Sequence, residues 1–283
     1  MLYLIYKRLV MRLMWFSTLS SLSVLSRVSH SFSLRGAIKP HLTKDHLHIA
    51  KLCRDVYSKD VEELDTFVQS KDTGIQATVT LEGTRAIICF RGSNQLKDWF
   101  LNLNMGKVPF LSRKHSDSEN KVHSGFFIGH NSVKSKIYTK LKVIVDSGNC
   151  ESILFCGHSL GSVLSILSAF DYVNPKKIPI SVVTFGSPRI GNKTFAENFN
   201  KEISCLRIVN DRDVVSVAPF QFMKFYHVGE TIQLKQDEVV VGDNTMWERV
   251  SWRFRGIFDF DFGIRDHKMP KYIEEIENHL KCK

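Results

Sequence analysis

The chain has 283 residues, of which 43% are hydrophobic and 24% are charged, and its net charge is +10. This is the composition of an ordinary globular protein, and a chain of this length can bury a core that needs neither disulfides nor a metal to fold. The basic residues are spread along the chain without zinc-finger spacing or an RNA-binding aromatic motif, which argues against a nucleic-acid partner. A solvated basic surface and attraction to anionic lipid headgroups remain open.

The first 40 residues differ from the rest, because they are basic and rich in serine and contain no acidic residue. Their apolar stretch, Leu13 to Leu25, is too short and too polar for a membrane-spanning helix. A signal peptide, a transit-like segment, a helix on a membrane surface and a flanking helix are all open. We expect residues 1–40 to be a separate segment and residues 41–283 to be the folded domain. Location follows this segment: membrane-associated or secretory if it targets the chain, otherwise cytoplasmic.

From residue 42 onward, predicted helices and strands alternate. The predicted helices cover residues 42–57, 126–145, 160–172, 193–200 and 270–280. The predicted strands cover residues 76–81, 86–90, 153–156, 180–185, 205–209 and 225–229. Alternation of this kind predicts an α/β fold in which a mostly parallel sheet is covered by helices on both faces.

The cysteines are interpreted as buried small hydrophobic residues. Three of them, Cys89, Cys156 and Cys205, lie within apolar runs that are typical of buried strands. No two of the six are spaced as zinc ligands, so we expect mostly free thiols and no metal site. The six are Cys53, Cys89, Cys150, Cys156, Cys205 and Cys282.

One pentapeptide, Gly157-His158-Ser159-Leu160-Gly161, matches the G-x-S-x-G nucleophile elbow. A buried strand precedes it and an apolar helix follows it, which is the strand–turn–helix setting that the motif requires. The serine then lies at the start of a helix, where the N–H of Leu160 can stabilise an oxyanion. A second donor is expected in the turn after residues 86–90, where Ser93 offers an N–H and a hydroxyl.

A serine nucleophile needs a histidine base that follows it in this fold. Three histidines follow Ser159. His279 lies near the end of the last helix and His227 in a predicted strand, whereas His267 lies in a predicted loop that lets it reach the serine. We therefore predict His267 as the base.

The base needs a carboxylate, which belongs just beyond the carboxyl end of a strand. Asp211 and Asp213 both follow the strand at residues 205–209. Asp213 precedes two valines, so we expect it to be partly buried and able to orient an imidazole, whereas Asp211 is interpreted as a turn former. Asp266 is adjacent to His267, and adjacent side chains diverge. We predict Asp213 as the acid.

Six motifs in order resemble the class 3, fungal-lipase-like family of α/β-hydrolases. They are Phe90-Arg91-Gly92-Ser93 with Asp98-Trp99, Val122 to Phe126, Gly157 to Gly161, Phe185 to Gly191, Asn210 to Asp213, and Asp266 to Tyr272. The resemblance implies the α/β-hydrolase fold, with Ser159, Asp213 and His267 as triad and Ser93 and Leu160 as oxyanion donors. The chain departs from the family at Ser162, where a glycine or alanine is usual, and residues 1–40 match nothing in it.

These features predict a serine esterase that hydrolyses lipid esters, most simply acylglycerols, through an acyl-enzyme and without metal or cofactor. A phospholipase or acyltransferase on the same scaffold and a non-catalytic lipid-binding module are the alternatives. A membrane or lipid-droplet surface is an expected partner. The connection between Ser93 and His123 predicts a mobile lid with Trp99, Phe100 and Leu103 on one face. The alternative is an inert loop over Trp99 and Leu103 as fixed core residues. Oligomeric state has no signal in the sequence.

Overall fold

The computed structural model describes residues 41–93, 106–111, 118–219, 223–235, 239–242 and 260–281. The N-terminal segment of residues 1–40 lies outside these ranges, and so do residues 94–105 and 112–117, which hold most of the expected lid. Within the described ranges, no helix combines the length and the hydropathy that crossing a membrane requires.

A mixed sheet forms the centre of the fold, and in the described part of the chain it has eight strands in the order β1-β2-β3-β6-β7-β8-β9-β10. The five central strands from β3 to β9 are parallel, and the strands outside them are antiparallel. The strands are β1 (Phe67–Gln69), β2 (Gln76–Glu82), β3 (Arg85–Phe90), β6 (Ser152–His158), β7 (Ile180–Phe185), β8 (Ser204–Asn210), β9 (Glu230–Leu234) and β10 (Val239–Val241). A separate pair, β4 (Lys107–Pro109) and β5 (Lys121–His123), is antiparallel.

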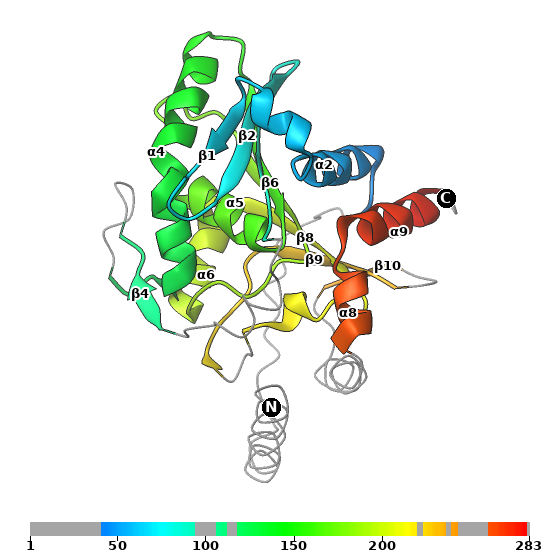
Figure 1. Cartoon of the computed structure of the whole chain (residues 1–283). Helices are drawn as coiled ribbons and strands as arrows, with labels where there is room; N and C mark the ends of the chain where they lie inside the picture. Colours follow the sequence, from blue (N-terminus) through cyan, green and yellow to red (C-terminus); the bar gives the residue numbers. More distant parts are fainter. Residues whose placement is uncertain are drawn as a thin grey trace, which may run out of the picture. The chain divides into compact units, whose positions relative to one another are not determined.

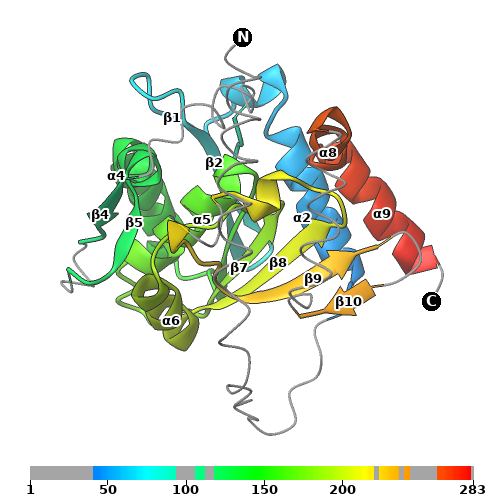
Figure 2. The same ribbon diagram turned by 90° about the horizontal axis from the view of Figure 1, so that it is seen from below.

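Helices cover both faces of the sheet, as Figures 1 and 2 show. Helices α4, α5 and α6 pack on one face, and α2 and α9 on the other. The helices are α2 (Lys44–Asp55), α4 (Ser124–Asp146), α5 (Leu160–Asp171), α6 (Lys193–Glu202), α8 (Phe260–Asp266) and α9 (Met269–Lys281), with short 3₁₀ turns η1 (Lys59–Glu63) and η2 (Val215–Val217).

Alternate residues of the central strands enter opposite hydrophobic layers. In β3, Ile88 and Phe90 face the layer of α4 and α5, while Ile87 and Cys89 face that of α2 and α9. Because successive side chains of a strand point to opposite faces, a strand buried on both sides reads as one continuous apolar run. This confirms the predicted fold, a mostly parallel sheet between two layers of helices.

The prediction of a strand at residues 225–229 is wrong. Tyr226 makes only an isolated bridge with Gly191, and the next strand, β9, begins at Glu230. The predicted loop around His267 is also wrong in extent, because α8 ends at Asp266 and α9 begins at Met269, which leaves a turn of two residues.

Candidate active site

The carboxyl ends of four neighbouring parallel strands meet at one edge of the sheet, and each leads into a segment of the site. Ser93 follows β3, Ser159 follows β6, Gly186 follows β7 and Asp213 follows β8. Ligands and catalytic groups of open α/β sheets gather at this edge, because loops that leave parallel strands in the same direction converge there.

Ser159 occupies a sharp turn between β6 and α5, with φ 59° and ψ −125°. A residue with a side chain reaches this left-handed region only when its surroundings impose it, at a cost of about 1–3 kcal/mol. Two hydrogen bonds hold the turn, from Ser159 N–H to Phe185 O (3.0 Å) and from Ser162 N–H to Ser159 O (3.0 Å). A Cβ on Gly157 would lie 2.4 Å from the backbone of Gly161, so the strand and helix approach as the elbow motif requires.

Ser162 contributes more than its small size suggests. Its hydroxyl lies 2.8 Å from the carbonyl oxygen of Gly157 and 3.0 Å from that of Phe185. Glycine or alanine at this position could not donate to either carbonyl. The hydroxyl therefore ties the first turn of α5 to the ends of β6 and β7, directly beneath Ser159.

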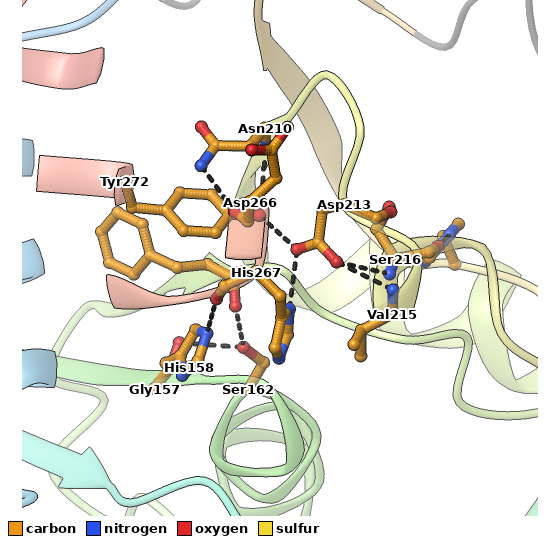
Figure 3. Close-up of polar contacts among 12 residues, drawn as sticks. Gly157, His158, Ser162, Asn210, Asp213, Val215, Ser216, Asp266, His267 and Tyr272 are labelled. Carbon is orange, nitrogen blue, oxygen red and sulfur yellow. Dashed lines mark hydrogen bonds and ion pairs between the residues drawn. The ribbon is translucent and has the colours of Figure 1, made fainter. Parts of the chain in front are cut away.

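Asp213 and His267 form a buried pair, shown in Figure 3, with Nδ1 of the imidazole 2.8 Å from Oδ2 of the carboxylate. A carboxylate only accepts, so Nδ1 carries the proton and Nε2 is left as the basic nitrogen. Nε2 is buried and has no hydrogen-bond partner among the described residues. Such a nitrogen is available to take a proton from a hydroxyl placed beside it.

The carboxylate of Asp213 is held by further donors. Its Oδ1 accepts from the N–H of Val215 at 2.8 Å, and its Oδ2 accepts from the Tyr272 hydroxyl at 2.6 Å. Tyr272 in turn accepts from the N–H of Asn210 at 3.1 Å, and burial raises the pKa of its hydroxyl, so Tyr272 stays a donor to the carboxylate. These contacts, visible in Figure 3, fix the face that Asp213 presents to His267.

A chain of hydrogen bonds links the loop of Ser93 to His267 through His158. The N–H of Gly92 lies 3.0 Å from the Tyr57 hydroxyl, which lies 2.9 Å from Nδ1 of His158, and Nε2 of His158 lies 2.6 Å from the carbonyl oxygen of His267. A carbonyl only accepts, so Nε2 of His158 donates, Nδ1 accepts from Tyr57, and Tyr57 accepts from Gly92. Burial lowers the pKa of His158 well below its ordinary value, which keeps the ring neutral as this order of donors requires.

The loop of Ser93 lies against the elbow. A Cβ on Gly92 would lie 2.6 Å from the His158 carbonyl oxygen and 3.1 Å from Cβ of Ser159. Ser93 and Leu160 also line one pocket, together with Gly92, Arg91 and Gln76 among others. Leu160 is the first residue of α5, where backbone N–H groups lack partners within the helix and the dipole favours negative charge.

His227, His279 and Asp211 were among the other candidate bases and acids. Nε2 of His227 faces the Ser216 carbonyl oxygen at 2.9 Å, and His279 belongs to α9. Oδ1 of Asp211 accepts from Gln233 at 3.4 Å. The structure thus brings His267 together with Asp213 rather than with Asp211.

Three residues of the site escaped the sequence analysis as functional candidates: Tyr57, His158 and Tyr272. Tyr57 lies 101 residues from His158, and Tyr272 lies 59 residues from Asp213. Contacts over such separations leave no local pattern. Only two of these residues lie within the motifs quoted above: His158 in the nucleophile elbow, and Tyr272 five residues after His267.

Part of the chain that carries Ser93, Ser159 and Asp213 matches a known protein family. The family model described as Lipase (class 3) matches residues 87–223. Among curated proteins, Phospholipase A1-Igamma1, chloroplastic, of Arabidopsis thaliana is 30% identical over 196 residues, which cover 59% of this chain and 38% of that protein. Phospholipase A1-II 1 of Oryza sativa subsp. indica is 30% identical over 173 residues, covering 52% and 44%. The chain thus spans less than half the length of these two relatives.

Solved structures share the fold. The triacylglyceride lipase of Rhizomucor miehei superposes with a TM-score of 0.60 at 23% identity, over 70% of this chain and 82% of that one. A lipase from Rhizopus microsporus var. chinensis gives 0.62 at 20% identity, over 75% and 87%.

Proposed function

The chain belongs to the class 3 lipase family through residues 87–223, and from that premise we propose that it is a serine-dependent carboxylic ester hydrolase that acts on acylglycerols. The observation that supports the proposal is the strained turn of Ser159, whose chain neighbour His158 lies 2.6 Å, through Nε2, from the carbonyl oxygen of His267 in the buried Asp213–His267 pair. His267 lies outside the matched residues, so its role rests on the geometry of the structure.

In the proposed reaction, Nε2 of His267 takes the proton of Ser159 as the serine oxygen attacks the ester carbonyl carbon. The N–H groups of Leu160 and Ser93 stabilise the oxyanion that forms, and each such donor is worth roughly 3 kcal/mol. His267 then protonates the departing alcohol, which leaves an acyl group on Ser159. Water, deprotonated by the same histidine, releases the fatty acid and restores the serine.

Asp213 acts through the histidine. It holds the tautomer with the proton on Nδ1 and stabilises the imidazolium that forms during the attack. Its four contacts with Tyr272, Val215, Ser216 and His267 leave one orientation for the ring. Every step uses groups of the chain and water, without a metal or cofactor.

A glycerophospholipid is the second candidate substrate, because the two curated relatives are named as phospholipases A1. The same acyl transfer serves both substrate classes, since only the group attached to the leaving alcohol differs. A lipid surface is the proposed partner in either case, with the net charge of +10 favouring anionic headgroups.

The test is a substrate panel with the full chain. Fatty-acid release is measured from triacylglycerol, diacylglycerol and glycerophospholipid dispersed in the same mixed micelles, with wild type, Ser159→Ala, His267→Ala and His279→Ala. We expect release from at least one lipid that disappears with the first two changes and survives the third. Release that persists in folded Ser159→Ala would contradict the mechanism, and a higher rate on glycerophospholipid would replace acylglycerol as the substrate.

A further inference from the structure

Three cysteines from separate segments meet beneath the candidate active site. Cys53 comes from α2, Cys89 from β3 and Cys156 from β6, and their sulfur atoms all lie within 4.8 Å of one another. The sulfurs of Cys53 and Cys89 are 3.7 Å apart, and Cys89 and Cys156 are register partners on neighbouring parallel strands. The three cysteines are 36 and more residues apart in the chain, so their spacing along the sequence gives no sign that they meet.

The spacing of these sulfurs suits one metal ion at their centre. Metal–thiolate bonds of about 2.3 Å place the sulfurs of a trigonal site about 4.0 Å apart and those of a tetrahedral face about 3.8 Å apart. The observed separations, 3.7 Å for one pair and at most 4.8 Å for the others, bracket both values. Changes of at most about 1 Å in a sulfur–sulfur separation would therefore complete the bonds.

The burial of the three cysteines and the number of available ligands indicate which ion would bind. All three side chains are at most 2% exposed and lie in the apolar layer that α2 and α9 form against the sheet. The described residues add no fourth His, Cys, Asp or Glu to the group. Structural zinc is almost always four-coordinate, whereas Cu(I) is a soft ion that thiolates select and that is stable with few ligands.

We propose that Cys53, Cys89 and Cys156 form a three-sulfur binding site for a single Cu(I) ion. Each Cu–S bond forms as an S–H bond breaks and its proton passes to solvent, and no electron is transferred. Because the site is closed, the ion enters while the chain folds or when α2 opens locally.

The site connects the three segments on which hydrolysis depends. Cys89 lies four residues before Ser93, Cys156 three residues before Ser159, and Cys53 four residues before Tyr57. An ion bound to all three sulfurs ties α2 to β3 and β6 just below the loops that they carry. Since the folded chain binds the ion and the unfolded chain lacks the preformed site, binding stabilises the fold.

The experiment refolds the reduced full chain anaerobically with Cu(I) buffered by a chromophoric chelator, and it measures stoichiometry, affinity and melting temperature. We expect one Cu(I) per chain and a rise in Tm of about 5–10 °C when free Cu(I) is about 100 times Kd. Cys53→Ala should weaken binding at least ~10-fold. Cys205→Ala, which removes a buried thiol of β8 outside the group, should leave binding unchanged.

X-ray absorption at the copper edge of the wild-type protein keeps the proposal testable if Cys53→Ala fails to fold. Three sulfur neighbours are expected around copper. Absence of bound copper, neighbours of nitrogen or oxygen, equal affinity in wild type and folded Cys53→Ala, or a disulfide between two of the three cysteines would each overturn the proposal. These readouts do not involve ester hydrolysis, so their failure is distinct from failure of the proposed function.

Discussion

Removing one oxygen atom from Tyr57 tests how the loop of Ser93 is positioned. In Tyr57→Phe, the N–H of Gly92 and Nδ1 of His158 lose the hydroxyl that lies 3.0 and 2.9 Å from them. A buried polar group left without a partner costs about 1–3 kcal/mol. With two such groups, one of which can regain water in the pocket that Gly92 lines, we expect a loss of about 2–4 kcal/mol in the free energy of unfolding.

The catalytic effect is separable from the loss of stability. Complete loss of an oxyanion donor costs about 10²–10³ in kcat, and a displaced loop loses part of that, so we expect kcat to fall about 10–100-fold with KM little changed. The control is Tyr138→Phe, which removes a buried hydroxyl that lies 3.0 Å from the Ser168 carbonyl oxygen on α5. Both variants should unfold at lower urea concentration, but only Tyr57→Phe should lose kcat on a soluble ester. Equal kcat in the two variants would refute the positioning role.

Three further outcomes follow from the site and its surroundings. Asp213→Asn should lower kcat about 10³–10⁴-fold, because an amide no longer stabilises the imidazolium of His267; steady-state kinetics that show a loss below 10-fold would contradict this. Gly186→Ala places a Cβ 2.5 Å from Oδ2 of Asp213, at a φ of 58°, so kcat should fall at least about 10-fold. The control is Gly148→Ala, at a φ of 84° with nothing within 4 Å of the new Cβ, which should cost only about 1–3 kcal/mol of stability. Burial lowers the pKa of His123 from 6.5 to about 4. Between these pH values the unfolded chain binds a proton that the folded chain does not, so the free energy of unfolding falls as pH drops through this window. The slope for this group is at most ~1.4 kcal/mol per pH unit. His123→Asn should flatten this slope in urea titrations at several pH values, and an unchanged slope would show that His123 is not the group responsible.

Much of the central architecture could be predicted, because its signals are local and repeat along the chain. The strand at residues 180–185 was predicted with its observed bounds, and the helix after Ser159 within one residue. Both are long apolar runs flanked by turn residues. The short strands β1, β4, β5, β9 and β10 were missed, since three to five residues carry too little periodicity and their pairing depends on neighbours.

The helix α8 shows how packing outweighs local propensity. Its segment contains Gly263, which disfavours a helix interior by about 1 kcal/mol relative to alanine. In the structure a Cβ at Gly263 would lie 2.3 Å from Cγ1 of Val214, so the glycine lets α8 approach the loop that carries Asp213. The sequence of residues 260–266 contains no pattern that predicts the contact between Gly263 and Val214.

The predicted site divides in the same way. Ser159 and Asp213 follow strands and were predicted from their positions in the chain, and His267 was predicted by elimination among three histidines. The supports of the site, Tyr57, His158 and Tyr272, and the group of Cys53, Cys89 and Cys156 exist only through long-range contacts. These contacts could be recognised only once the three-dimensional fold was known.

Covalent labelling of Ser159 tests the central claim most directly. The folded full chain is treated with a fluorophosphonate probe, which reacts with an activated serine hydroxyl, and the labelled peptide is identified by mass spectrometry. We predict a single adduct on Ser159, formed in wild type, strongly slowed in His267→Ala and absent after denaturation before labelling. An unlabelled Ser159 in folded protein, or labelling that survives in Ser159→Ala at the same rate, would contradict the account.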